Sequence, residues 1–330
     1  MGLVRMVRPW NEWLIVWGYD INQPEPEVTT KFATKVVRDL VGDQSIQPEI
    51  TSVSTWTVNN MYATHMQSGR VFIMDSFNLA WKLAAVIKAQ AAESLLDSYS
   101  EERAPVAKQI VTRANQSIGE FGPIFEALGL TESTDPEVMQ ANMDKRCDAN
   151  MEAEQQRAAI REAIAFKKYE FDAHGVEMNQ RYKSSAIVTD GQMEPAFELD
   201  AELHYQPTTW PGARIPHAWV YDHDGGKHST LDLVGRGQFT ILTGINGEAW
   251  VEAAEKVGSA LGLDIHAHVI GPRRDIIDHH GDWARAREVN EAGCVLVRPD
   301  QHVAWRADDM AENPEVELTR VLSAVLHRAN

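Results

Sequence analysis

Residues 70–90 read RVFIMDSFNLAWKLAAVIKAQ, and this stretch predicts a short apolar strand that runs directly into an amphipathic helix. The strand is expected at residues 70–74 and the helix from Asp75 onward. The helix positions expected to be buried are Phe77, Leu79, Leu83 and Val86. A strand that enters a helix normally needs a short loop, and neither glycine nor proline lies between the two here. The junction therefore indicates that a segment is missing.

On the N-terminal side of this stretch, two antiparallel strands, LVRMVRP and WLIVWGYD, are expected around a turn at residues 10–12. Trp13 and Trp17 are expected to pack inward, because tryptophans in such a hairpin belong to a core more often than to a substrate site. A short amphipathic helix is predicted over residues 28–41, and a further β-like stretch over residues 49–61.

On the C-terminal side, a second helix is expected from about Ser94 to Ile118. It contains Glu101, Glu102 and Arg103, which are interpreted as a solvated ion-pair face, with a functional role as the alternative. Residues 136–183 are rich in charges of both signs and almost free of glycine and proline, which predicts a helical bridge. The prolines and glycines of residues 190–214 then indicate a loop between domains.

The last third of the chain repeats the order of elements found in a thioredoxin-like core. Strands are predicted at residues 239–242 and 264–270, a hairpin at residues 294–305, and helices at residues 248–261 and 316–326. The redox motif of such a core would lie after the first strand, where this chain has Gly244, Ile245, Asn246 and Gly247. Thiol-disulfide chemistry is therefore excluded at that position. We expect the thioredoxin-like part to fold alone from about Thr209.

The composition excludes several classes of protein. The 330 residues carry a formal net charge of -17, which disfavours binding to nucleic acid. No run of eighteen apolar residues exists, so no membrane span is expected. The first ten residues lack the pattern of a secretory signal, and the two cysteines, Cys147 and Cys294, stand in no metal or redox spacing. A cytoplasmic protein with reduced thiols is expected.

Short motifs add little chemistry. His266 and His268 share one face of a predicted strand, and His279 and His280 lie near Asp282, but a third metal ligand is not marked in either case. Surface histidines are the preferred interpretation, and no metal is expected. The glycines at 235 and 237 precede a strand and do not open a helix, so a turn is preferred to a dinucleotide-binding loop. The sequence contains no G-x-S-x-G, no P-loop and no H-E-x-x-H motif, so the commonest hydrolases and nucleoside triphosphatases are not indicated.

Longer segments carry a resemblance to a known family. They are RVFIM with DSFNLAWKLAAVIKAQ, LLDSYSEERAPVAKQIV, MNQRYKSSAIVTDG, EPAFELDAELHYQPTTWPGARIPHAWV, STLDLVGRGQFTILTG and VLVRPDQHVAWRA. Together they resemble the flavin-dependent aromatic hydroxylases, and specifically the phenol hydroxylase branch. The resemblance extends over essentially the whole chain.

The resemblance implies a mixed α/β fold in three parts. Residues 1–120 would form part of an FAD- and substrate-binding domain, residues 121–205 a helical bridge and linker, and residues 206–330 a thioredoxin-like domain without redox cysteines. The implied activity is hydroxylation of a phenol or chlorophenol ortho to its hydroxyl group, with FAD as cofactor and NAD(P)H and oxygen as cosubstrates. A homo-oligomer is the implied assembly.

By the same resemblance, Trp56, Asn60 and Tyr62 would line the substrate pocket. Asp75, Ser76 and Asn78 would lie near the flavin. No residue of the chain matches a catalytic base of the family, so none is assigned.

Two flavin-binding elements of the family have no counterpart in this sequence. The Gly-x-Gly-x-x-Gly turn is not found, because Met1 enters the family pattern near its middle. Roughly twenty residues with a Gly-Asp motif are missing after Met74, which accounts for the absent loop. We therefore expect weak flavin binding and low activity of the isolated chain. The alternative is a non-catalytic remnant that serves as a dimerisation or interaction module.

Overall fold

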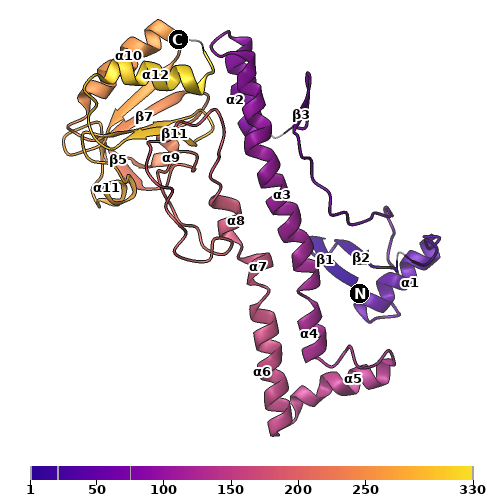
Figure 1. The fold of residues 1–330 in the computed structure, drawn as a ribbon. Coiled ribbons are helices and arrows are strands. Elements are labelled where there is room, and N and C mark those ends of the chain that lie inside the picture. Colours follow the sequence, from indigo (N-terminus) through magenta and orange to yellow (C-terminus); the bar gives the residue numbers. More distant parts are fainter. Residues whose placement is uncertain (1, 21, 75, 329–330) are drawn as a thin grey trace. The chain divides into compact units, whose positions relative to one another are not determined.

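The computed structural model describes residues 2–20, 22–74 and 76–328, without the side chain of Ser76. The described chain forms two compact units that are divided between Asn59 and Asn60 (Figure 1). Each unit is described by itself. The expected three-part division at residues 120 and 205 stays a prediction.

The first unit contains the expected hairpin and helix. Strand β1 (Gly2–Arg8) pairs antiparallel with β2 (Glu12–Trp17), with a bulge between Met6 and Arg8. Helix α1 (Thr30–Val41) begins where the Thr29 hydroxyl accepts a hydrogen bond from the backbone N–H of Phe32 at 3.2 Å. It ends at Gly42, whose φ of 78° suits glycine.

Two expectations for this part of the chain are wrong. Trp13 and Trp17 do not pack into a core, because both keep more than a third of their surface exposed. The Trp17 ring lies against those of Tyr19 and Phe32, and it meets the edge of Phe32 at a centroid distance of 5.3 Å. Residues 49–61 form no strand, since none of their backbone groups enters a ladder among the described residues. The β-branched residues of this stretch alternate well but lack a partner strand.

The second unit begins with the junction that the sequence marked. Strand β4 (Val71–Phe72) pairs with β3 (Gln67–Ser68), so the expected strand over residues 70–74 shrinks to two residues. Helix α2 (Ser76–Ile87) follows. Leu79 is buried as expected, but Phe77 is 61% exposed, contrary to expectation. Phe77 lies in the first turn of α2, next to a cavity and not under another element.

Helices occupy most of the next hundred residues, as predicted. They are η1 (Glu93–Leu96), α3 (Asp97–Gly119), α4 (Gly122–Ala127), α5 (Pro136–Asp144), η2 (Lys145–Cys147), α6 (Met151–Ala165), α7 (Lys168–Phe171) and α8 (His174–Met178). Lys167, at the start of α7, contacts the end of α3. Its buried ammonium group donates to the Ser117 carbonyl at 2.8 Å and lies 3.8 Å from the centre of the Phe121 ring.

The last part of the chain forms the predicted four-stranded sheet in the order β11-β10-β7-β8. Its strands are β7 (Phe239–Thr243), β8 (Ile265–Val269), β10 (Cys294–Val297) and β11 (Val303–Ala307). β7 and β8 are parallel, and β10 is antiparallel to both β7 and β11. Helices α10 (Glu248–Leu261) and α12 (Pro314–Val325) pack on one face (Figure 1). This confirms the thioredoxin-like arrangement.

The other face of this sheet is covered by smaller elements. They are the sheet β6-β5-β9, made of β5 (Trp219–Asp222), β6 (Lys227–Ser229) and β9 (Ile276–Ile277), with α9 (Thr230–Leu233) and α11 (Asp282–Ala286). Trp283 of α11 is fully buried against them. The turn predicted at residues 235–237 is present, and all three residues have positive φ.

The core of the thioredoxin-like part is not confined to that part. Trp81 and Ala85 of α2 and Leu95 of η1 belong to the same buried cluster as the strands and as helices α10 and α12. The Trp81 ring meets the Phe239 ring edge-on, with their centres 5.9 Å apart. Helix α2 therefore covers part of the sheet that lies more than 150 residues later in the chain.

The two thiols differ in surroundings. Cys294 is fully buried at the start of β10, and burial raises the pKa of its thiol, whereas Cys147 is exposed. Neither forms a disulfide, in agreement with the sequence. No helix in the described ranges is long and apolar enough to cross a membrane.

Candidate functional site

A buried cluster of four charged side chains joins α2, α3 and the turn between β10 and β11. The buried charge cluster consists of Lys82, Glu102, Arg298 and Asp300. Arg298 is fully buried, and its two terminal nitrogens donate to the two carboxylate oxygens of Glu102 at 2.6 and 2.9 Å. This fork geometry is the strongest arrangement that arginine makes with a carboxylate.

Asp300 and Lys82 complete the charge balance. Asp300 accepts from Nε and Nη2 of Arg298 at 3.0 and 2.5 Å. The Lys82 ammonium group donates to Glu102 Oε2 at 2.8 Å. The Ser184 hydroxyl donates to Glu102 Oε1 at 2.6 Å. Two cations and two carboxylates therefore neutralise each other out of contact with water, which is the condition for burying charge.

The local turn explains how Arg298 and Asp300 come together. The backbone N–H of Arg298 donates to the His302 carbonyl at 2.7 Å, and that of Gln301 donates back to the Arg298 carbonyl at 3.0 Å. Gln301 has a φ of 66°, which reverses the chain within a few residues. Arg298 of the turn thus meets Glu102 of α3, and Asp300 meets Asn78 of α2.

The cluster shifts the pKa of each acid and of its lysine. Burial disfavours the charged form of Glu102, but Arg298 and Lys82 outweigh it and lower the pKa of Glu102 to about 2. The pKa of Asp300 is also lowered, because Arg298 and His302 outweigh its burial. Burial lowers the pKa of Lys82 to about 8 despite the contact with Glu102. At neutral pH all three groups therefore remain charged.

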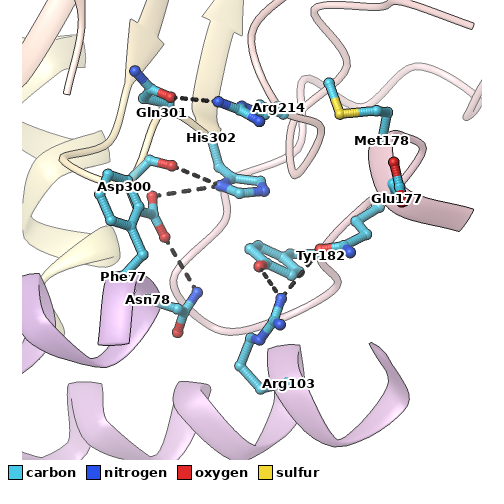
Figure 2. A pocket seen from close by; sticks show the side chains of 11 residues that line it. Phe77, Asn78, Arg103, Glu177, Met178, Tyr182, Arg214, Asp300, Gln301 and His302 are labelled. Carbon is cyan, nitrogen blue, oxygen red and sulfur yellow. Dashed lines mark hydrogen bonds and ion pairs between the residues drawn. The ribbon is translucent and has the colours of Figure 1, made fainter. Parts of the chain in front are cut away.

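A cavity of about 360 Å³ opens beside this cluster (Figure 2). Its walls come from the start of α2, from α3, from residues 177–182, from Arg214 and from residues 300–302. A cavity of this size lies at the lower end of the range for small-molecule sites.

His302 is a buried titratable side chain on the wall of the cavity. It is 9% exposed, and its ring stacks on Tyr182 with 4.3 Å between the ring centres. Its Nδ1 lies 3.0 Å from the Asp300 carbonyl, which assigns a proton to Nδ1 and leaves Nε2 as an acceptor in the neutral ring. Figure 2 shows the second ring nitrogen on the side away from Asp300, toward the space between Arg214 and Tyr182.

Two arginines also line the cavity. Arg103 donates to the Tyr182 hydroxyl at 2.8 Å and to Gln180 Oε1 at 3.1 Å. Arg214 donates to Gln301 Oε1 at 2.8 Å. Burial, with the nearby carboxylates, outweighs Arg103 and raises the pKa of Tyr182 to about 12, so its hydroxyl stays protonated.

The structure places the expected substrate residues on the surface of the described chain. Trp56 is 65% exposed and belongs to the first unit, whereas Asn60 and Tyr62 begin the second. The Lys108 ammonium group lies 5.8 Å from the centre of the Tyr62 ring. Their assignment to a substrate pocket stays a prediction.

Of the expected flavin contacts, Asp75 and the side chain of Ser76 lie outside the described part of the structure. Asn78 is 3% exposed, and its amide donates to Glu102 Oε2 at 2.6 Å and to Asp300 Oδ2 at 3.2 Å. Its Oδ1 has no hydrogen-bond partner among the described residues. The structure thus joins Asn78 to the buried charge cluster.

The interpretation of residues 101–103 as a solvated face is wrong for two of the three. Glu102 is 1% exposed at the centre of the buried charge cluster, and Arg103 lines the cavity. Glu101 remains accessible and caps Ser185, whose N–H donates to it at 2.9 Å. The sequence held one usable signal for Glu102: Lys82 on the preceding helix follows Trp81 within an otherwise apolar stretch.

Known families match most of the chain. A family model described as FAD binding domain matches residues 1–74 and 73–114, and one described as aromatic-ring hydroxylase, C-terminal, matches residues 208–329. The first model matches in two pieces that meet at residues 73–74, next to the junction without a loop.

Two curated relatives are 48% identical to the chain. One is 2,4-dichlorophenol 6-monooxygenase of Cupriavidus pinatubonensis (strain JMP 134 / LMG 1197), where the match covers 99% of this chain and 58% of the relative. The other is phenol 2-monooxygenase of Pseudomonas sp. (strain EST1001), where it covers 97% and 56%. The chain thus spans somewhat more than half the length of either relative.

The first alignment also locates a difference in length inside the matched region. It spans 349 positions, 19 more than the 330 residues of this chain. The relative therefore has residues inside the matched region that this chain lacks, and the segment expected to be missing after Met74 stays a prediction.

The chain is also similar to a solved structure of a flavin-dependent monooxygenase. The flavin-dependent monooxygenase PieE, in complex with FAD and substrate, is 40% identical with a TM-score of 0.89, over 99% of this chain and 60% of that one.

Proposed function

Since the chain belongs to the family of FAD-dependent aromatic-ring hydroxylases, we propose that it acts in the hydroxylation of a phenol ortho to the existing hydroxyl group, with FAD, NAD(P)H and oxygen. The observation that carries the proposal is 48% identity to a dichlorophenol monooxygenase over 99% of the chain. The phenol 2-monooxygenase relative supports the same substrate class. A chlorinated phenol is the proposed substrate, because the first relative is named for one.

The described residues offer only partial support for a flavin site. The amide nitrogen of Asn78 donates to Glu102 and Asp300, so its Oδ1, which has no hydrogen-bond partner among the described residues, is the atom left for a flavin contact, and Asn78 remains a proposed one. Asp75 and Ser76 remain proposed contacts. We therefore assign FAD through the family, and we assign no step of the reaction to a residue through it.

When bound, reduced FAD would supply the activated oxygen that the hydroxylation needs. The contribution of this chain's own residues is positional. The buried charge cluster ties α2, which begins at the proposed flavin contact Ser76, to the β10–β11 turn, because Lys82 of α2 and Arg298 of the turn both donate to Glu102 of α3. Trp56, Asn60 and Tyr62 remain the proposed substrate-pocket residues, and their exposure leaves them accessible to a ligand.

Further proposals follow from the family and the composition. We propose a homo-oligomer in the cytoplasm, with no nucleic-acid partner because of the net charge of -17.

A second candidate is the non-catalytic remnant, acting as an interaction module. One observation favours it: the match to the FAD binding domain model is split into two pieces at residues 73–74. The names of the relatives favour the enzyme.

The visible absorbance of the purified chain, after incubation with FAD and desalting, tests the proposal. The chain would then be supplied with NADPH or NADH and 2,4-dichlorophenol, and the products analysed by mass spectrometry. Retained flavin and a dichlorocatechol product are the outcomes expected of the enzyme. A colourless protein that forms no product would overturn the enzymatic proposal and leave the remnant.

A further inference from the structure

Strand β2 has one edge bonded to β1 and one edge that bonds to no strand among the described residues. The hairpin is a sheet of two strands (Figure 1), and no backbone hydrogen bond from outside it reaches residues 12–17. A two-stranded sheet is marginally stable by itself, and an open edge is a template for another strand. We propose that the outer edge of β2 pairs with β2 of a second copy of this chain, so that two hairpins form one four-stranded sheet. This inference gives a surface to the proposed homo-oligomer and does not depend on the proposed hydroxylation.

The sequence of β2 is symmetric in side-chain class about Ile15. Residues 13–17 read WLIVW, so Trp13 and Trp17 lie at equal distances on either side of Ile15, with Leu14 and Val16 between them. A two-fold axis through Ile15, perpendicular to the sheet, therefore places tryptophan opposite tryptophan and Leu14 opposite Val16 of the second copy. Such a contact joins the same patch of both copies and closes as a dimer.

Backbone geometry allows this register. In an antiparallel pair, the N–H and C=O groups of one residue point to the same edge, and successive residues alternate between the two edges of their strand. Two residues that bond across the new contact must both point outward, so they are an even number of positions apart along β2. Pairing Trp13 with Trp17 and Leu14 with Val16 meets this condition. It also keeps the side chains of each pair on one face of the sheet.

The charges around β2 favour a second copy as the occupant. No charged residue lies between Trp13 and Trp17, and Glu12 falls opposite Gly18, beyond the end of the strand. The contact therefore brings no like charges together, although both copies are the same chain. β1 is less suited to pairing, because Arg5 lies at its middle and charged side chains protect an edge from a further strand.

Helix α1 leaves the outer edge of β2 accessible. It covers one face of the hairpin, where a Cβ atom at Gly2 would lie 2.4 Å from Leu40 and where Trp17 meets Phe32. The opposite face carries Leu14, which is 47% exposed. Both contacts of α1 involve a face and not the edge, so a second copy can approach β2 in the plane of the sheet.

Sedimentation velocity on the 330-residue chain without flavin tests the association. We expect a reversible dimer with a Kd on the order of 10 µM, because five residues from each copy make a contact smaller than a standard interface. Each copy carries a net charge of -17 and the contact contains no ion pair, so added salt should tighten the dimer. A chain that stays monomeric well above this concentration would overturn the proposal, as would species larger than a dimer.

Two lysine variants locate the contact. Leu14→Lys removes two apolar contacts with Val16 and brings two ammonium groups to diagonal positions across the axis, so the Kd should rise at least about tenfold. Leu3→Lys is the matched control, because Leu3 is an exposed leucine on the same face but belongs to β1. Its Kd should equal that of the unaltered chain. Equal effects of the two variants would contradict pairing through β2.

Disulfide cross-linking tests the register. In a Cys147→Ser background, which removes the exposed thiol, Ile15→Cys places two introduced thiols opposite each other at the axis, within reach of a disulfide bond. Val4→Cys is the control, because Val4 pairs with Ile15 inside the hairpin and is separated from the axis by β2. Oxidised glutathione should give a covalent dimer of the Ile15→Cys variant alone, seen on a non-reducing gel.

The cross-linking result also separates this inference from the proposed homo-oligomer. A dimer that is unaffected by Leu14→Lys and forms no disulfide bond in the Ile15→Cys variant would assemble through another surface, which overturns pairing through β2. Equal cross-linking of the Ile15→Cys and Val4→Cys variants would overturn the register. Because the lysine and cysteine variants differ in position and in readout, a folding defect in one of them does not leave the proposal untested.

Discussion

Arg298 stands between two carboxylates in the interior of the second unit, so its replacement tests the buried charge cluster at the scale of one residue. Arg298→Met removes the cation that faces Glu102 and Asp300 and leaves both acids under-compensated. We expect a loss of about 3–5 kcal/mol in the free energy of unfolding, measured by urea denaturation. Arg320→Met, at an exposed ion pair of α12, should change it by less than about 1 kcal/mol. Equal losses would contradict the assignment.

The same cluster predicts how stability depends on pH. The pKa of Glu102 is about 2 in the folded chain against an ordinary 4.5, so the folded state binds fewer protons between these values. The stabilisation is complete above pH 4.5 and is lost as the pH falls toward 2, by about 3 kcal/mol for this group. Urea midpoints measured from pH 6 to pH 3 check the direction.

The control for this pH dependence is the double variant Glu102→Gln with Arg298→Met, which removes one charge of each sign. Lys82 and Asp300 then still balance one another. Its stability should fall less steeply with acid than that of the unaltered chain. Parallel curves would assign the acid sensitivity to other carboxylates.

At this scale the sequence predicted little of the site. Glu102 in a helix with charged neighbours is solvated in most proteins, and the partner that buries it, Arg298, lies 196 residues away. Nothing local distinguishes a paired arginine from an exposed one. The cysteines were simpler, because two distant cysteines gave no support for a disulfide framework and both are free thiols in the structure.

At the scale of an element, Gly212 fixes the path by which the loop after the helical bridge reaches β11. Its φ is 95°, and a Cβ atom there would lie 2.1 Å from the Tyr182 carbonyl oxygen. Its own N–H donates to the Val303 carbonyl at 2.8 Å. Gly212→Ala is therefore expected to cost at least about 3 kcal/mol in the free energy of unfolding, from strain and from the clash.

Gly225 is the matched control for this substitution. It also has a positive φ, 84°, but a Cβ atom there would meet nothing within 4 Å. Gly225→Ala should cost only about 1–2 kcal/mol, the conformational part alone. If both variants unfold at the same urea concentration, the close approach to Tyr182 is not a constraint.

Elements were predicted well where the pattern was long and locally supported. The helix over residues 248–261 has the predicted bounds, because an amphipathic repeat there ends at Gly262 with a φ of 67°. Residues 49–61 failed for the opposite reason: alternation of β-branched residues is necessary for a strand, but a partner strand must also be present. The junction near Met74 was marked by the absence of glycine and proline, and in the structure Ile73 and Met74 lie between β4 and α2 and belong to neither element.

At the scale of the whole molecule, the shared core tests whether the thioredoxin-like part folds alone from about Thr209, as the sequence led us to expect. A fragment of residues 206–330 loses Trp81, Ala85 and Leu95 from its core and leaves Arg298 without Glu102. We expect it to unfold at a clearly lower urea concentration than residues 60–330 and to resist trypsin less. Equal midpoints would show that the fragment is self-sufficient.

The difference in exposure between Cys147 and Cys294 lets thiol labelling report transient opening of the central sheet. An alkylating dye at neutral pH reacts with a thiolate on the surface, so it modifies Cys147 within the first minutes and leaves Cys294 in β10 untouched. Every later increment of label measures how often the central sheet opens to solvent. Mass spectrometry of the labelled chain can therefore measure how often the sheet around Cys294 opens, without any engineered probe, as each ligand is added.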